Sequence, residues 1–201
     1  CYFCFTSCLY IRYYIFLMSK KKIAILGSTG SIGKTLFDII KKDKNKFKII
    51  LLTANKDYKT LLEQAKTLKV KNLIITNKKS FKILKSKNNK LNINVFNNFE
   101  NLNQIFQYKI DYIMNSITGI EGLDPTLEII KYTKKIAIAN KESIICGWGL
   151  INKSLKKNKT EFIPVDSEHF SIWSVIKDYK KSDIEKVILT ASGGPFLNKK
   201  I

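Results

Sequence analysis

The residues best suited to metal chemistry form a short carboxylate cluster near the end of the chain. The segment Pro164–His169 contains Asp166 and Glu168, which are separated by one residue. In an extended segment such side chains point to the same side, with Cα atoms about 7 Å apart. Oxygen ligands of this kind suit Mg²⁺ or Mn²⁺ better than Zn²⁺. A solvated turn or a helix cap is the alternative, but the apolar residues on both sides argue against exposure.

A second candidate site is a glycine loop near the start. Gly27, Gly30 and Gly33 lie between an apolar strand-like run and a helical pattern, in the spacing G-x-x-G-x-x-G. We expect Gly27 to permit a tight turn, Gly30 to let the backbone approach a pyrophosphate and Gly33 to allow close helix packing. The free N–H groups of the helix start would face the anion. The alternative is a glycine-rich turn that binds nothing.

The end of the second predicted strand indicates which dinucleotide the loop would bind. An NAD site usually has an acid there for the ribose 2′-hydroxyl. Here Asn55 and Lys56 come first, and no acid occurs before Asp57. A lysine at this place suits a 2′-phosphate, so NADP is favoured over NAD. Lys56 could equally be one of many surface lysines.

Alternating strand-like and helix-like segments position these residues. Buried-strand runs alternate with helical spacings such as that of Ile32, Leu36, Ile39 and Ile40. This alternation predicts an α/β fold, a Rossmann-like parallel sheet with helices on both faces. The polar stretch 77–98 is the hardest to assign. The predicted strands are 23–26, 47–52, 73–75, 112–114 and 136–139.

Composition excludes some partners. The formal net charge is +20, but the lysines are spread over the whole chain and Arg12 is the one arginine, so we expect a solvated surface and no nucleic-acid partner. Three of the four cysteines lie within the first eight residues, which gives no disulfide framework and favours a reducing, cytoplasmic location. Residues 1–17 are apolar but short for a membrane span. We interpret them as extraneous upstream sequence or, alternatively, as a leader of a plastid-type organelle.

The sequence resembles the 1-deoxy-D-xylulose 5-phosphate reductoisomerases over residues 19–201. Each of the motifs is weak alone, but their order and separations are those of that family. The motifs are the glycine loop 27–33, Ala139-Asn140-Lys141-Glu142-Ser143, Pro164–His169 and Thr190-Ala191-Ser192-Gly193-Gly194-Pro195-Phe196.

The resemblance implies an enzyme that uses NADPH and a divalent metal, Mg²⁺ or Mn²⁺. It would convert 1-deoxy-D-xylulose 5-phosphate, a phosphorylated sugar, to 2-C-methyl-D-erythritol 4-phosphate in isoprenoid precursor synthesis. Lys141 would bind substrate and act in catalysis with Asp166 and Glu168, which would hold the metal. The remaining implied contacts are Thr29, Gly30, Ser31, Ile32, Asn140 and Glu142 with the cofactor, and Ser167, Glu168 and Ser192 with the substrate.

The resemblance also implies a domain plan and a partner. Residues 18–160 would form the NADPH-binding domain and residues 161–201 the beginning of a truncated α+β catalytic domain. The third carboxylate ligand would lie beyond Ile201, so the chain alone would be inactive, and the full-length protein would be a homodimer. Asp57 departs from the family, in which many members have Asn, and this puts a ribose-side contact in doubt.

Two other classes remain to be weighed. Another NADP-dependent dehydrogenase, such as an aspartate-semialdehyde dehydrogenase, would leave the two carboxylates unexplained. A basic nucleotide- or RNA-binding module would use the glycine loop but not the carboxylates. We expect His169 to pack or to form hydrogen bonds, and Cys146 to be a buried apolar residue. Lys141 follows a predicted strand, at the edge where α/β sheets bind ligands.

Overall fold

The computed structural model describes residues 20–87 and 92–188, so residues 1–17 and Ser192 lie outside the described residues. The chain divides into two compact units between Ile163 and Pro164. Each unit is described by itself below.

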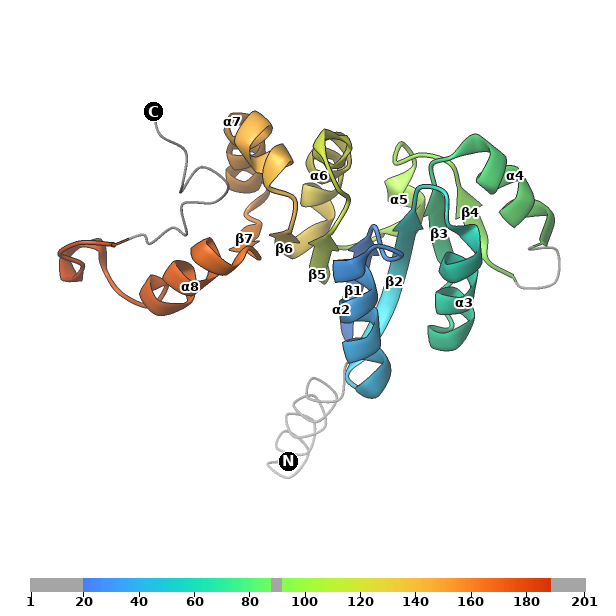
Figure 1. Ribbon diagram of the computed structural model, residues 1–201, viewed down its shortest axis with the longest axis horizontal. Coiled ribbons are helices and arrows are strands. Elements are labelled where there is room, and N and C mark those ends of the chain that lie inside the picture. Colours follow the sequence, from blue (N-terminus) through green and yellow to red (C-terminus); the bar gives the residue numbers. More distant parts are fainter. Residues whose placement is uncertain (1–19, 88–91, 189–201) are drawn as a thin grey trace, which may run out of the picture. The chain divides into compact units, whose positions relative to one another are not determined.

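The first unit is built on a seven-stranded sheet in the order β4-β3-β2-β1-β5-β6-β7 (Figure 1). All pairings from β4 to β6 are parallel. The strands are β1 (Lys21–Leu26), β2 (Phe47–Ala54), β3 (Asn72–Ile75), β4 (Asn94–Phe96), β5 (Ile110–Asn115), β6 (Thr133–Ile138) and β7 (Glu161–Pro164).

Helices cover both faces of this sheet because the strand side chains alternate between two apolar clusters. Ile23 and Ile25 of β1 pack with residues of α2, α3 and α4, whereas Ala24 and Leu26 pack with residues of α5, α6 and α7. This confirms the predicted Rossmann-like arrangement. The helices are α2 (Ser31–Lys42), α3 (Tyr58–Leu68), α4 (Lys78–Lys87), α5 (Leu102–Ile105), η1 (Ile120–Gly122), α6 (Leu123–Ile129), η2 (Ile130–Tyr132) and α7 (Lys141–Asn158).

The predicted helix after the glycine loop is present, but its buried face differs from the prediction. Gly33, Phe37 and Ile40 face the core, while Ile32 is 42% and Ile39 is 55% exposed. The buried residues follow the i, i+4, i+7 spacing of one helix face. Ile32 and Ile39 lie off that face, although they are apolar.

The strand order changes direction beside β1. The chain passes outward from β1 to β4 and then returns to β5 on the other side of β1 (Figure 1). The segments that leave β1 and β5 therefore diverge at the carboxyl edge of the sheet. Open α/β sheets bind ligands at such a point.

The second unit begins with a helix where the sequence predicted an extended segment. Strand β7 ends at Pro164, and α8 (Ser167–Ile176) starts directly after Asp166. The extended geometry predicted for Asp166 and Glu168 is therefore wrong, since the chain turns into a helix between them. A short 3-10 helix, η3 (Lys181–Asp183), follows.

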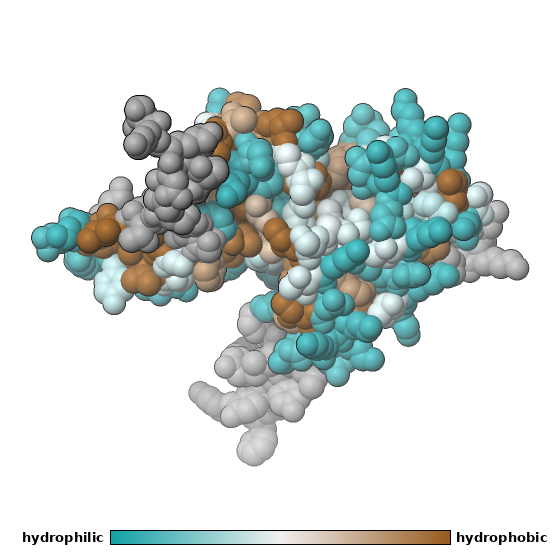
Figure 2. All heavy atoms as spheres, viewed as in Figure 1, coloured by the Kyte–Doolittle hydropathy of each residue, from teal (hydrophilic) through white to brown (hydrophobic). Residues whose placement is uncertain are grey.

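Hydrophilic residues cover part of the surface of the first unit. Over α2 and α3 the viewed face is mainly hydrophilic (Figure 2). No helix within residues 20–87 and 92–188 combines the length and the apolar character that crossing a membrane requires.

Candidate functional site at the carboxyl edge of the sheet

The turn after β1 is fixed by the end of β2. Gly27 has a φ of 72°, which glycine adopts without strain. The Gly27 N–H donates to Thr53 Oγ1 at 3.0 Å, and the Ser28 N–H donates to the Thr53 carbonyl at 2.8 Å. A Cβ on Gly27 would lie 2.8 Å from the Ser116 carbonyl oxygen, so the segment directly after β5 also crowds this turn. The predicted tight turn is confirmed.

A buried glutamine anchors the same turn from α3. Gln64 is 5% exposed, and its Nε2 donates to the Ser28 carbonyl at 2.9 Å. Ser28 Oγ donates in return to Gln64 Oε1 at 2.8 Å. Sequence reasoning did not identify Thr53 or Gln64. The signal that could have found Gln64 is a polar residue within the apolar stripe of α3.

The start of α2 is open to an anion. Gly30 is the N-cap, and no side chain caps the helix there. A Cβ on Gly33 would overlap the Gly27 carbonyl oxygen, whereas one on Gly30 would meet the same oxygen only at 3.4 Å. Glycine at position 33 is therefore needed for α2 to pack closely against the turn at Gly27 and Ser28. The free N–H groups of the first turn remain available to a phosphate.

Two exposed residues, Asn55 and Lys56, directly follow the end of β2. Their carbonyls accept hydrogen bonds from Asn77 N at 3.1 Å and from Ser80 Oγ at 2.8 Å, which fixes the backbone.

Asp57 is the N-cap of α3, and its Oδ1 accepts from Thr60 N at 3.0 Å. Burial acts to raise its pKa, but the hydrogen bonds from Thr60 and Lys59 and the charge of Lys34 outweigh burial and lower the pKa overall. The carboxylate is therefore ionised at neutral pH.

A cavity of about 190 Å³ lies between the first turn of α2 and the loops after β5 and β6. Ile32 lines it from α2, which explains why this apolar side chain is exposed. The loop 116–119 and the segment 139–142 form the remaining walls. The cavity therefore brings together Ile32, Asn140, Lys141 and Glu142 from separate parts of the sequence.

Asn140 holds the loop that lines this cavity. It is 5% exposed, and its Nδ2 donates to the carbonyls of Ile117 at 2.7 Å and Gly119 at 3.0 Å. Its Oδ1 accepts from Ser143 N at 2.9 Å and so caps α7. Both amide hydrogens are used within the protein, so the side chain has none left to donate to a ligand.

A second amide supports the other end of the loop. Asn115 is fully buried, and its Nδ2 donates to Thr126 Oγ1 at 2.5 Å and to the Gly122 carbonyl at 3.2 Å. Its Oδ1 accepts from Ile117 N at 3.0 Å. Ser116 Oγ donates to the Leu26 carbonyl at 2.7 Å, which ties the loop to β1. The sequence analysis did not identify these residues.

Helix α7 begins with two exposed charges at the cavity. Lys141 and Glu142 are its first two residues. Ser143 is fully buried, and its Oγ is the one buried side-chain N or O atom without a partner in the described part of the chain. Cys146 is an exposed free thiol, so the prediction that it is buried was wrong. It lies on the solvent side of α7, one residue before the buried Gly147.

Asp166 belongs to the second unit, where it caps α8. Its Oδ1 accepts from His169 N at 3.0 Å and contacts His169 Nδ1 at 2.6 Å. Burial acts to raise its pKa, but the hydrogen bonds and charge of His169 lower it overall, so Asp166 is ionised at neutral pH. His169 thus has the hydrogen-bonding role expected for it. Ser167 and Glu168 form the first turn of α8.

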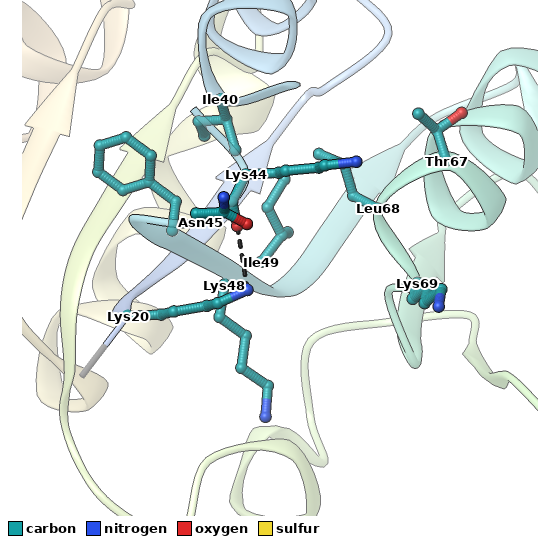
Figure 3. Close-up of a pocket in the computed structure, with 10 residues that line it drawn as sticks. Lys20, Ile40, Lys44, Asn45, Lys48, Ile49, Thr67, Leu68 and Lys69 are labelled. Atoms are coloured by element: carbon teal, nitrogen blue, oxygen red, sulfur yellow. Dashed lines mark hydrogen bonds between the residues drawn. The ribbon is translucent and has the colours of Figure 1, made fainter. Parts of the chain in front are cut away.

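The described residues contain no group of three or more side chains arranged to hold a metal ion. A larger cavity, of about 560 Å³, lies at the opposite edge, beside the starts of β1 and β2. Its lysines do not converge on one point: Lys44, Lys48 and Lys69 extend in different directions, and the Lys20 ammonium donates to the Lys44 carbonyl at 3.1 Å (Figure 3). These residues form a solvated basic surface.

The doubly wound sheet, the open α2 start and the adjoining cavity define a dinucleotide-binding α/β protein. The family model of 1-deoxy-D-xylulose 5-phosphate reductoisomerase matches residues 23–148, and the model of its C-terminal domain matches residues 162–201. The chain therefore belongs to the 1-deoxy-D-xylulose 5-phosphate reductoisomerase family.

Similar proteins agree with this assignment. The reductoisomerase of Pelagibacter ubique is 61% identical over 180 residues, which are 89% of this chain and 46% of that protein. That of Wolbachia pipientis from Culex pipiens is 41% identical over 179 residues, again 46% of its length. The Zymomonas mobilis enzyme in complex with NADPH has a TM-score of 0.82 and 31% identity, covering 90% of this chain and 48% of that one. The chain thus spans about half the length of its relatives.

Proposed function

We propose that this chain supplies the NADPH-binding part of a reductoisomerase that converts 1-deoxy-D-xylulose 5-phosphate to 2-C-methyl-D-erythritol 4-phosphate. The observation that carries the proposal is the uncapped first turn of α2, which follows a turn held by Thr53 of β2 and by Gln64 of α3. Its free N–H groups suit a pyrophosphate. The structure of the Zymomonas mobilis relative in complex with NADPH supports this ligand.

Each part of the edge then has a distinct task. Thr29, Gly30 and Ser31 bind the pyrophosphate, while Asn55 and Lys56 face the 2′-phosphate. Ile32 and Glu142 line the cavity beside the nicotinamide. Lys141 places an ammonium group at the cavity mouth, where it attracts the substrate. A bound NADPH supplies the hydride, and a bound divalent metal polarises the substrate oxygens.

Asp166 fits the metal role in its chemistry, because it is an ionised carboxylate and hard cations prefer oxygen. Glu168 and Ser167 complete the proposed set from the start of α8, with Ser192 as a further substrate contact. A relative crystallised with fosmidomycin and magnesium, 31% identical with a TM-score of 0.77, supports Mg²⁺. We place residues 18–160 in the cofactor domain and 161–201 in the catalytic domain, in a cytoplasmic homodimer.

The test is a fluorescence titration with NADPH of the chain and of Gly30→Val. A side chain at Gly30 meets little of the protein, so the variant should fold with a helix start weakened by about 1 kcal/mol. It should nevertheless lose NADPH binding at least tenfold, because the valine occupies the path of the pyrophosphate. A folded Gly30→Val protein with unchanged NADPH affinity would remove the glycine loop from the site.

The reaction itself is tested in a fusion of this chain to the remaining C-terminal part of the Pelagibacter ubique relative. We expect this fusion to oxidise NADPH when 1-deoxy-D-xylulose 5-phosphate is added. The same fusion with Glu168→Gln should be inactive and should bind Mn²⁺ more weakly. Full turnover by the Glu168→Gln fusion would contradict the metal assignment while leaving the cofactor site intact.

A further inference from the structure

Asp57 places a fixed negative charge after the end of β2, next to Lys56, which is proposed to face the 2′-phosphate of the cofactor. It follows Lys56 directly at the carboxyl end of β2, the position at which doubly wound proteins distinguish the ribose 2′-hydroxyl from its phosphate. Asp57 is exposed, and its Oδ1 is fixed by Thr60 N at 3.0 Å. The Asp57 side chain therefore cannot rotate away from this edge without losing the hydrogen bond that caps α3.

The same carboxylate also occupies the start of α3. A helix N-terminus carries a partial positive charge that attracts anions. In this chain that charge is already compensated by Asp57, whose carboxylate takes hydrogen bonds from Thr60 and Lys59. A phosphate arriving at the end of β2 meets an occupied helix start, whereas the start of α2 is uncapped. The two neighbouring helix starts thus differ in their attraction for a phosphate.

Two lysines attract a phosphate to this edge and so oppose the effect of Asp57. Lys56 is exposed at the strand end, and the charge of Lys34 from α2 reaches the Asp57 carboxylate. Because part of the Lys34 charge is neutralised by Asp57, less of it is available to a bound phosphate. The net potential at this edge is therefore less positive than the lysines alone would produce.

We propose that Asp57 is a specificity-determining residue that weakens the preference of this chain for NADPH over NADH. The proposal rests on the proposed cofactor site. Asp57 acts by repelling the 2′-phosphate and by compensating the start of α3, and it accepts a hydrogen bond from the 2′-hydroxyl of NADH. Asn at this position keeps the cap, because Asn and Asp are about equally good N-caps, and removes only the charge.

The experiment compares NADPH and NADH affinities of the chain, Asp57→Asn and the control Asp43→Asn. Asp43 follows α2 at its far end, about 18 Å along a 12-residue helix from the glycine loop. Its exposed pair with Lys46 contributes little to stability. Both variants change the net charge equally, but only Asp57 lies at the proposed phosphate.

At about 0.1 M salt, where the screening length is about 10 Å, Asp57→Asn should tighten NADPH binding about three- to tenfold. NADH binding should not tighten, and Asp43→Asn should change neither. At about 1 M salt the gain for NADPH should largely disappear. Unchanged NADPH affinity in a folded Asp57→Asn protein, or equal gains for both cofactors, would overturn the inference while the cofactor site stands. Absence of NADPH binding in every protein would overturn the proposed function as well.

Discussion

The hydrogen bonds of Asn140 make a sharp prediction about the loop 116–119. Asn140→Asp retains an oxygen that accepts from Ser143 N, so α7 keeps its cap. The variant loses the Nδ2 donor to the carbonyls of Ile117 and Gly119, which now face a carboxylate oxygen. The substitution therefore separates bracing of the loop from capping of the helix.

The expected magnitude follows from the two lost hydrogen bonds. Leaving a buried acceptor unsatisfied costs about 1–3 kcal/mol. Because Asn140 is 5% exposed, water does not replace the donor without movement of the loop. We expect Asn140→Asp to lower the free energy of unfolding by about 2–4 kcal/mol, less if the loop shifts outward. NADPH affinity should fall at least tenfold, since the shifted loop reshapes the cavity wall.

Urea unfolding monitored by circular dichroism measures the first effect, and NADPH titration measures the second. The free energy of unfolding decreases by about 2 kcal/mol per molar urea for a protein of this size, so the urea concentration at the unfolding midpoint should fall by about 1–2 M. Ser143→Ala is the matched control, because it removes an unpartnered hydroxyl from the same turn and should leave the midpoint nearly unchanged or slightly raised. A midpoint for Asn140→Asp within about 0.2 M of the parent would refute the argument that this amide holds the loop.

Two further predictions concern stability. Gly33→Ala should lower the free energy of unfolding by about 2 kcal/mol or more, because its Cβ overlaps the Gly27 carbonyl oxygen; urea unfolding that matches the parent would contradict this packing. Asp111→Asn should cost about 1 kcal/mol at neutral pH, since Asp111 pairs with Lys134 at 2.9 Å and accepts from Lys22 N at 2.9 Å. Burial acts to raise the pKa of Asp111, but these partners lower it below 3.8, so its stabilisation is present above that value and is lost as pH falls through the folded pKa. The melting temperatures of the parent protein and of Asp111→Asn should therefore become equal under strongly acidic conditions. A difference in melting temperature that does not change with pH would count against the ion pair.

The sheet could be predicted from the sequence because its central strands are continuous apolar runs. Residues 23–26 and 136–138 are buried, so the side chains on both faces of these strands are apolar. Strand β4, with three residues, and helix α4, rich in lysine, lie in the polar stretch that could not be assigned. They are short or polar because they lie at the edge of the sheet, where little apolar surface is buried.

The glycine loop was predictable because steric limits leave few alternatives to glycine at Gly27 and Gly33. Gln64, Thr53 and Asn115 were not, since a polar residue in an amphipathic pattern gives no sign of its partner far along the chain. The helix cap at Asp166 was predicted only as the less favoured alternative to a metal ligand, for a related reason. An aspartate after an apolar strand is compatible with a metal ligand and with an N-cap, and the start of α8 was hidden by the neighbouring carboxylate.

The close approach of Gly122 to Asn140 restricts how this family member can evolve. A Cβ at Gly122 would overlap the Asn140 amide, although the two residues are far apart in the sequence. Gly122 cannot accept a side chain unless the side chain of Asn140 is changed first, so substitutions at the two positions are expected to be strongly non-additive. Mutant libraries of this edge should therefore vary the two positions as a pair, and accepted changes along a lineage should appear in a fixed order.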